Sequence, residues 1–205
     1  MSQDKGHGIL FVLSAPSGTG KTTIANRLVA ETPGVKRSVS YTTRPMREGE
    51  TDGADYIFVD EEKFKRMMAD DSFIEWAEVH GKYYGTSIKT MREAKASHTD
   101  LILVIDIQGA ANIKKKKLDA VFIFLLPPSM KELRRRLGLR GSETKEEVEK
   151  RLETAKKEIA ACTMYDYIVV NDDLETAGNE VENIILAERS KRAREALSFP
   201  DYELP

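Results

Sequence analysis

An apolar segment that runs directly into a glycine-rich loop constrains this chain more than any other feature. Residues 9–14, Ile-Leu-Phe-Val-Leu-Ser, predict a buried strand, and residues 15–22 continue as Ala-Pro-Ser-Gly-Thr-Gly-Lys-Thr. Gly18 and Gly20 permit backbone turns that a side chain would block, so successive N–H groups can converge on phosphate oxygens. The segment therefore predicts a site for a nucleoside triphosphate, without indicating what receives the phosphate.

The end of the loop supplies a charge and a metal ligand. Lys21 can reach the β- and γ-phosphates, and the Thr22 hydroxyl can ligate Mg²⁺. Thr22 also begins a predicted helix over residues 22–31, whose N-terminal dipole favours the same anion. The loop pattern G-x-x-x-x-G-K-[ST] has one departure, because Ala15 stands where its first glycine is expected.

Composition indicates an ordinary globular enzyme. The chain has 205 residues, of which 32% are charged and 40% hydrophobic, and a formal net charge of −2. That charge argues against non-specific nucleic-acid binding as the main activity. The single cysteine, Cys162, excludes an internal disulfide and is predicted to be a packed thiol. Because no apolar run approaches membrane-spanning length, we expect a cytoplasmic protein.

Three further apolar runs predict strands buried on both faces of a parallel sheet. They are residues 101–105, 121–126 and 167–170. Helices are predicted between them from the capping boxes Ser129-x-x-Glu132 and Thr144-x-x-Glu147, and a last helix over 174–196. This alternation predicts an α/β fold with a central parallel sheet flanked by helices.

Between residues 38 and 90 the pattern changes to a mixed insertion. Short alternating segments are expected at 35–41 and 56–59, with a helix over 61–70. A hairpin is expected from residues 73–79 and 82–86 around His80-Gly81. Ser87 is then predicted to cap a helix that continues to about residue 97.

Two arginines at the start of the insertion are candidates for a second phosphate site. Arg44 and Arg47 follow the hydroxyl-rich stretch Ser-Val-Ser-Tyr-Thr-Thr. Guanidinium groups bind phosphate bidentately through charge-assisted hydrogen bonds. Surface arginines are also commonly solvated, and the spacing alone leaves both interpretations open.

Several short motifs, taken in order, resemble those of the guanylate kinase family over residues 9–190. They are Ala-Pro-Ser-Gly-Thr-Gly-Lys-Thr, Ser-Val-Ser-Tyr-Thr-Thr-Arg, Gly-Ala-Asp-Tyr, Phe-Ile-Glu-Trp, Tyr-Tyr-Gly-Thr, Ile-Asp-Ile-Gln-Gly and Val-Asn-Asp-Asp-Leu. The resemblance implies a P-loop kinase core with a small mixed α/β GMP-binding insertion and a lid. It also implies ATP-dependent phosphorylation of GMP, and of dGMP, in purine nucleotide metabolism and GMP recycling.

Carried over by position, the resemblance implies two sets of GMP contacts. Those to the phosphate are Ser40, Arg44, Arg47, Tyr56 and Tyr84, and those to the guanine are Glu75, Thr86 and Asp106. Guanine presents two adjacent donors that a carboxylate can accept as a pair, and adenine lacks this pair. The alternative for Glu75 is a surface strand residue beside a packed Trp76.

Asp106 has two interpretations. A carboxylate at the end of a buried strand resembles a group that helps to hold Mg²⁺, whereas the family resemblance implies a guanine contact. The family carries a second acidic residue two places earlier, where this chain has Val104. This departure affects any contact that the second acid makes near the metal or acceptor.

The resemblance places a lid at about residues 131–151. It implies that Arg136, Arg140 and Arg151 face the triphosphate, whereas Arg134 and Arg135 are expected to be solvated. Asn171 is implied to lie near the adenine, with a turn or cap after the preceding strand as its alternative role. The implied catalytic residues are Lys21, Arg44, Arg136, Arg140 and Arg151. The implied ATP-binding residues are Ala15, Pro16, Ser17, Gly18, Thr19, Gly20, Lys21, Thr22 and Asn171.

The resemblance also divides the chain and indicates its partners. The core is expected over 1–37 and 90–205, and the GMP-binding insertion over 38–89. The expected cofactor is Mg²⁺, held with ATP by Thr22. We expect ATP and GMP as small-molecule partners, no nucleic acid and no membrane, and the sequence leaves a homo-oligomer open.

The sequence disfavours three rival functions. A catalytically silent protein-binding module would be expected to lose the loop or the lid arginines, and this chain retains both. A sugar-phosphate kinase is disfavoured by the segment from Ser40 to Tyr56 together with Glu75 and Thr86. A switch GTPase is disfavoured because the sequence has no Asn-Lys-x-Asp motif.

Overall fold

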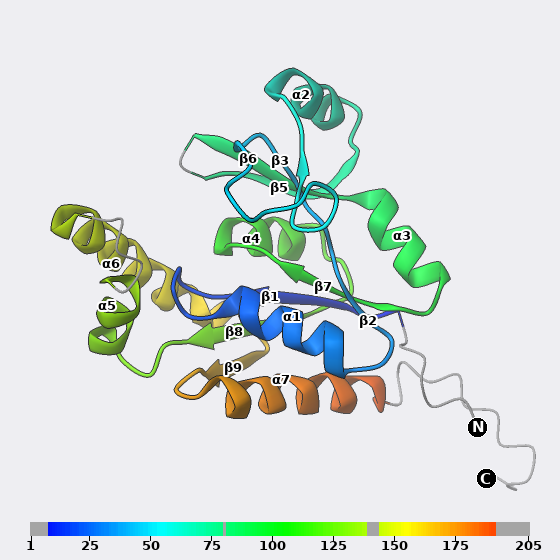
Figure 1. Cartoon of the computed structure of the whole chain (residues 1–205). Coiled ribbons are helices and arrows are strands. Elements are labelled where there is room, and N and C mark those ends of the chain that lie inside the picture. Colours follow the sequence, from blue (N-terminus) through cyan, green and yellow to red (C-terminus); the bar gives the residue numbers. More distant parts are fainter. Residues whose placement is uncertain (1–7, 80, 139–143, 192–205) are drawn as a thin grey trace, which may run out of the picture.

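The core of the molecule is a parallel β-sheet. The structure is a computed structural model and describes residues 8–79, 81–138 and 144–191. The five strands described for this sheet lie in the order β2-β7-β1-β8-β9, all parallel (Figure 1). Their bounds are β2 (Val35–Arg37), β7 (Asp100–Val104), β1 (Leu10–Ser14), β8 (Ala120–Leu126) and β9 (Tyr167–Val170). The central parallel sheet predicted from the apolar runs is therefore confirmed.

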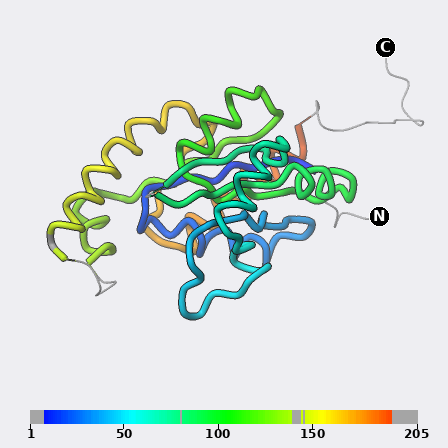
Figure 2. Tube along the Cα trace, turned by 90° about the horizontal axis from the view of Figure 1, so that it is seen from above, coloured from blue at the N-terminus to red at the C-terminus, as the bar shows by residue number. Residues whose placement is uncertain are grey.

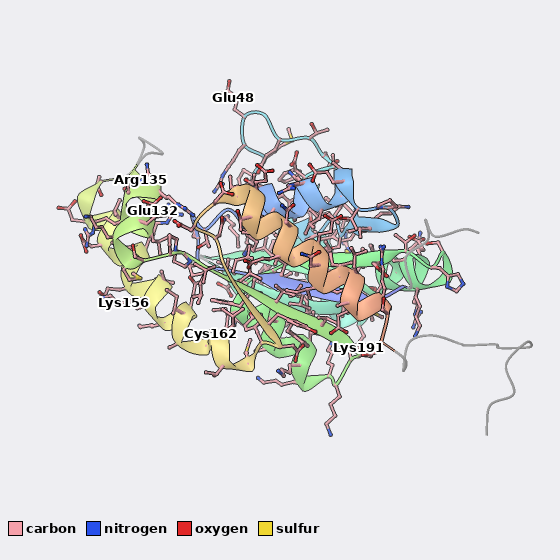
Figure 3. All side chains as sticks on the ribbon, turned by 90° about the horizontal axis from the view of Figure 1, so that it is seen from below. Glu48, Glu132, Arg135, Lys156, Cys162 and Lys191 are labelled. Atoms are coloured by element: carbon pink, nitrogen blue, oxygen red, sulfur yellow. The ribbon has the colours of Figure 1, made fainter. Side chains whose placement is uncertain are left out.

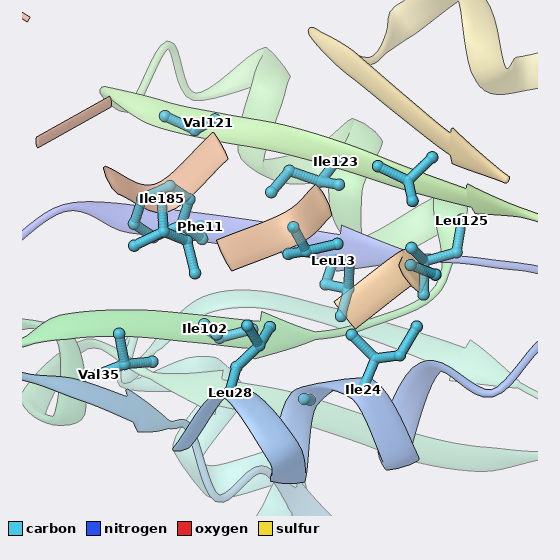
Figure 4. Packing of buried hydrophobic residues seen from close by; sticks show 14 of the residues in the cluster. Phe11, Leu13, Ile24, Leu28, Val35, Ile102, Val121, Ile123, Leu125 and Ile185 are labelled. Atoms are coloured by element: carbon cyan, nitrogen blue, oxygen red, sulfur yellow. The ribbon is translucent and has the colours of Figure 1, made fainter. Parts of the chain in front are cut away.

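Helices α1 (Lys21–Glu31) and α7 (Leu174–Arg189) cover one face of this sheet (Figure 1). The apolar side chains between them form one buried cluster, which includes Phe11, Ile24 and Ile185 (Figure 4). Arg27 of α1 joins the two helices, because its Nη2 donates to Asn179 Oδ1 at 2.6 Å. This layer holds the start of α1 against the end of β1, where the glycine-rich loop lies.

The opposite face carries α3 (Ile88–Ala96), α4 (Ile107–Lys115) and a 3₁₀ segment, η1 (Ala161–Met164). Leu10, Val12 and Phe124 belong to the buried cluster on this side. Cys162 packs against the same cluster, as predicted for a packed thiol. The two clusters account for the uniformly apolar strands, since both sides of the sheet are covered.

A second sheet forms the mixed insertion above the core (Figure 1). Its strand order is β4-β3-β6-β5. The bounds are β3 (Tyr41–Thr42), β4 (Ile57–Phe58), β5 (Phe73–Val79) and β6 (Lys82–Ser87), with helix α2 (Glu61–Ala69) beside them. Phe64 of α2 stacks on Phe73 at a centroid distance of 4.6 Å. The predicted hairpin is confirmed as the antiparallel pair β5–β6, although His80 at its turn lies outside the described residues.

Helices α5 (Met130–Gly138) and α6 (Lys145–Ala160) form a unit at one end of the molecule (Figure 2). They share a small buried cluster that includes Leu133, Leu137 and Leu152. The capping box predicted at Thr144 is complete, with both reciprocal hydrogen bonds present. The Ser129 hydroxyl accepts from the Glu132 N–H, but the Glu132 carboxylate accepts from Arg135 and Arg136 instead of closing a box.

Two predicted boundaries were wrong. The segment expected at 35–41 forms two strands, β2 and β3, in different sheets. The Ser38 N–H still donates to Ile102 O in the large sheet, whereas Ser40 O accepts from the Ile57 N–H in the small one. The last helix ends at Arg189 rather than 196, where the Ser190 hydroxyl donates back to Leu186 O at 3.1 Å. Among the described residues, no helix combines the length and apolar character needed to cross a membrane.

Candidate active site

The glycine-rich loop has the backbone shape that the sequence predicts. Gly18 and Gly20 have φ of +88° and +91°, in the left-handed region that favours glycine. Gly20 is the N-cap of α1 and offers no side-chain hydrogen bond to the helix. The first N–H groups of α1 therefore remain available to an anion. Ala15 is buried in the cluster beneath the loop, so its methyl group points into packing and leaves the loop geometry intact.

Lys21 lies at the point where the loop meets the end of β7. Its Nζ donates to Ile105 O at 3.2 Å. Burial lowers the pKa of the Lys21 ammonium, while the nearby charges of Asp106 and Glu158 act in the opposite direction. Thr22, in the first turn of α1, is exposed. The end of the loop therefore presents the Lys21 ammonium and, at the next residue, the exposed Thr22 hydroxyl.

Asn171 braces the loop from the end of β9. Its Nδ2 donates to Thr19 O at 2.5 Å, and the side chain is fully buried. A Cβ on Gly20 would lie 2.7 Å from Asn171 Nδ2, so this contact also needs glycine at position 20. The capping role left open for Asn171 belongs to Asp173, whose Oδ1 accepts from the Thr176 N–H at 2.8 Å.

A buried carboxylate lies in the small sheet opposite the loop. Glu75 on β5 is 4% exposed, and its Oε1 accepts from the Thr86 hydroxyl at 2.8 Å. Thr86 Oγ1 also lies 3.4 Å from Ser40 Oγ. Burial raises the pKa of Glu75 to about 7, with the Asp106 charge adding to the effect and the Thr86 hydrogen bond opposing it. The alternative of a surface Glu75 is thus wrong, whereas Trp76 beside it is 39% exposed.

Asp106 lies between the two halves of the site. It is the N-cap of α4, and its Oδ1 accepts from the Gly109 N–H at 2.8 Å. Its charge acts on both Lys21 and Glu75. A Cβ on Gly109 would lie 2.7 Å from Glu75 Oε2, so the absence of a side chain there lets Glu75 approach α4. The half-buried Val104 packs against the α1–α7 cluster.

The two predicted phosphate arginines differ in their surroundings. The Arg44 guanidinium donates to Glu50 Oε1 at 2.6 Å and lies over the rings of Tyr56 and Phe58. Tyr56 in turn makes an edge contact with Tyr84, at a centroid distance of 6.0 Å. Arg47 is exposed on the adjoining turn. The structure thus brings Arg44, Tyr56 and Tyr84 together, with Arg47 nearby along the chain.

Of the arginines predicted for a lid, Arg136 of α5 contacts the segment after β9 and Arg151 of α6 contacts the loop. Arg136 donates to the backbone oxygens of Asn171 and Asp172, at 3.0 and 3.2 Å. Arg151 donates to the Ser17 hydroxyl of the loop. Arg140 lies outside the described residues. Arg134 and Arg135 are exposed as predicted, and each is also paired with a glutamate. Arg134 pairs with Glu149, and Arg135 pairs with Glu132 (Figure 3).

Sequence reasoning missed two carboxylates at this site. Glu50 pairs with Arg44, and Glu158 of α6 acts electrostatically on Lys21. Burial raises the pKa of Glu158, with a further contribution from Asp106. Glu158 is seven residues after Arg151, and this helical spacing places both on one face of α6. The spacing could have identified Glu158, whereas the Arg44–Glu50 pair depends on a turn that has no comparable signal.

Comparison with known proteins gives one consistent family. A family model described as guanylate kinase matches residues 8–188. The guanylate kinase of Syntrophotalea carbinolica is 50% identical over 190 residues, 93% of this chain and 90% of that protein. That of Geobacter sulfurreducens is 49% identical over 93% of this chain and 94% of its own. A crystal structure of guanylate kinase from Anaplasma phagocytophilum matches with a TM-score of 0.78 at 40% identity, covering 94% of this chain and 92% of that one.

Proposed function

This chain belongs to the guanylate kinase family and phosphorylates GMP to GDP with ATP, and we propose that the side chains described above bind the two nucleotides and carry out the transfer. The core over 1–37 and 90–205 holds ATP under the lid at 131–151. The insertion over 38–89 holds GMP. The observation that carries this assignment is that Glu75 Oε2 and Asp106 Oδ1 lie 2.7 and 3.4 Å from the Cβ position of Gly109, while Lys21 of the loop donates to Ile105 O, the residue before Asp106.

The donor site is the loop from Ala15 to Thr22. The positive φ of Gly18 and Gly20 and the uncapped start of α1 support phosphate binding by backbone N–H groups. Lys21 then places its ammonium at the β- and γ-phosphates. Asn171 supports ATP binding through its hydrogen bond to Thr19 O, and Arg136 lies against the same segment.

The exposed hydroxyl of Thr22 fits a site for Mg²⁺ delivered with ATP. Mg²⁺ is commonly held by one or two protein oxygens together with substrate phosphates and waters. When bound, the ion neutralises charge that develops on the β- and γ-phosphate oxygens. Thr22 would supply one ligand. Asp106 has Oδ1 committed to capping α4, and its other oxygen is assigned to the guanine edge.

The acceptor site binds the base and the phosphate of GMP through two separate sets of residues. Glu75, Thr86 and Asp106 bind the guanine edge, where the ionised Glu75 carboxylate accepts from two adjacent donors. Ser40, Arg44, Arg47, Tyr56 and Tyr84 bind the GMP phosphate. A base that leaves the buried carboxylate unpaired is rejected by roughly 10⁴ or more. This asymmetry, rather than shape alone, makes the site selective for GMP.

Transfer needs alignment and charge rather than a general base. A GMP phosphate oxygen attacks the γ-phosphorus in line, the bond to the β–γ bridging oxygen breaks, and ADP leaves with that electron pair. The acceptor phosphate is already largely ionised near neutral pH, so no side chain needs to remove a proton. Arg44 acts from the acceptor side and Arg136, Arg140 and Arg151 from the lid, where they offset charge and exclude water.

The proposed function is tested by ADP formation with GMP, dGMP, AMP, CMP and UMP offered in turn. GMP and dGMP should support turnover, and Lys21→Ala should lower it by about 100-fold or more, because a preorganised charge is lost. Lys63→Ala, which removes an exposed lysine of α2, is the matched control.

Equal turnover with AMP would contradict the guanine assignment. Tight GMP binding without turnover would favour a protein-binding module instead. Circular dichroism of Lys21→Ala must match the parent chain, since an unfolded variant would remove the basis for assigning Lys21 to transfer.

A further inference from the structure

The turn at residues 47–50, just after Arg44, ends in a carboxylate, that of Glu50. The nucleotide contacts and the transfer step described above do not include Glu50. Glu50 Oε1 accepts from Arg44 Nη2 at 2.6 Å, and the two side chains are only 19% and 12% exposed. Arginine and carboxylate in a surface loop are more often loosely paired. Here both charges are largely shielded from solvent, beside the phosphate site proposed above.

The carboxylate is held in place by its own turn. Glu50 Oε2 accepts from the Arg47 N–H at 2.8 Å, and the Glu50 N–H donates to Arg47 O at 3.1 Å. One oxygen is thus bound to the backbone at Arg47 and the other to the side chain of Arg44. Glu50 therefore ties the side chain of Arg44 to the backbone of Arg47, the second arginine assigned to the GMP phosphate.

The guanidinium of Arg44 keeps donors for a ligand. Its Nη1 donates to Pro45 O at 2.7 Å and its Nη2 to Glu50, while the rings of Tyr56 and Phe58 lie 5.3 and 5.7 Å from its central carbon. The Tyr84 hydroxyl is a further hydrogen-bond partner of this guanidinium. A guanidinium has five N–H donors, so these three bonds leave two for a phosphate. The Arg44 guanidinium is therefore held in one orientation and still has N–H donors for a ligand.

We propose that Glu50 is a positioning residue for phosphoryl acceptors, which holds the Arg44 fork and the Arg47 turn in the arrangement that binds the GMP phosphate. This inference rests on the proposed function, because it takes Arg44 as a phosphate ligand. Arg44 also lowers the pKa of Glu50, so the carboxylate stays ionised at neutral pH. The opposite possibility is that Glu50 competes with the substrate phosphate for Arg44. Its anchorage to the Arg47 backbone argues against that, since a competing anion would have to move away.

The test compares Glu50→Gln with Glu48→Gln by equilibrium titration with GMP and with guanosine. Glu48 lies two residues away in the same loop and extends from the molecule (Figure 3), so its substitution removes the same charge without the same contacts. Glu50→Gln should weaken GMP binding by about tenfold or more, the effect of losing one charge-assisted bond. Guanosine binding and KM for ATP should stay unchanged, as should all values for Glu48→Gln.

Glu50→Asp separates geometry from charge. It keeps the negative charge but is one methylene shorter, so it cannot reach Arg44 and the Arg47 N–H together, and it should lose GMP affinity to a similar extent. Unchanged GMP affinity in Glu50→Gln, tighter GMP binding, or equal losses for GMP and guanosine would each overturn the proposal. A parent chain that binds guanosine no more weakly than GMP would instead show that the proposed phosphate site itself is wrong.

Discussion

Under the proposed function, single side chains decide which nucleotide this molecule accepts, and Glu75 is the clearest case. Its carboxylate is buried, and one oxygen is already bound to Thr86. Burial raises the pKa of Glu75 to about 7, from an ordinary value of 4.5. Part of the Glu75 population is therefore protonated near neutral pH, and binding of the base must favour the ionised form, which can accept from guanine.

Guanine binding should therefore strengthen as pH rises through the pKa of Glu75. Guanosine is the appropriate probe, because the GMP phosphate has its own titration near pH 6. Isothermal titration between pH 5.5 and 8.5 should show affinity that falls about tenfold per pH unit well below pH 7 and levels off above it. Glu75→Gln should bind guanosine more weakly and with a flat profile. A flat profile in the parent chain would contradict a buried, protonated Glu75.

The raised pKa of Glu75 also makes the free energy of unfolding depend on pH. A carboxyl with a raised folded-state pKa contributes stability that is complete below pH 4.5 and is lost between pH 4.5 and about 7. Relative to Glu75→Gln, the parent chain should lose about 3 kcal/mol of unfolding free energy across that window. Urea unfolding at pH 4.5 and pH 8 measures it. A loss of the same size in both chains would assign the pH dependence to other groups.

At the scale of elements, capping and apolar runs predicted most of what forms. Ser87 and Thr144 cap helices as expected, because a capping hydrogen bond joins residues close together in the sequence. The three apolar strands also lie where they were expected, because a strand buried on both faces is apolar at nearly every position. The strand order and the division at 38–40 could not be predicted, since they depend on which distant backbone offers a partner. Glu50 is a similar case, because its role follows from the turn that brings it to Arg44.

The Thr144 capping box should matter for the proposed lid more than for the whole molecule. Thr144→Ala removes the hydroxyl that accepts from the Glu147 N–H and should cost α6 about 1 kcal/mol. Amide hydrogen exchange should then accelerate in the first turns of α6. Thr154→Ala, which removes an exposed hydroxyl bonded to Lys150 O on the same helix, is the control. Equal acceleration in both variants would show that the box does not hold the helix start.

At the scale of the whole molecule, a buried ion pair connects the sheet to its last helix. Asp100 of β7 is fully buried, and its Oδ2 accepts from Arg189 Nε of α7 at 2.7 Å. The other oxygen accepts from the Ile9 N–H at 2.9 Å, and Arg189 Nη2 donates to Pro33 O at 2.7 Å. One pair therefore connects the starts of β1 and β7 with α7 and the segment after α1, whereas the glycine-rich loop follows the end of β1.

Breaking this pair should destabilise the fold. Arg189→Ala leaves Asp100 without its main countercharge and should lower the unfolding free energy by about 3–5 kcal/mol in urea. Arg66→Ala, which removes half of an exposed pair with Glu62, should cost less than about 1 kcal/mol. Similar losses in the two variants would contradict a structural role for the Asp100–Arg189 pair.

We propose that the two nucleotide sites meet at Asp106 and that the carboxylate of Glu75 makes the acceptor site specific. The ratio of kcat/KM for GMP to that for AMP, measured in the parent chain and in Glu75→Gln, tests this most directly. We predict a ratio of roughly 10⁴ or more in the parent chain, and a fall of at least about 100-fold in the variant as GMP loses its paired acceptor. A parent ratio near one, or an unchanged ratio in Glu75→Gln, would contradict this account.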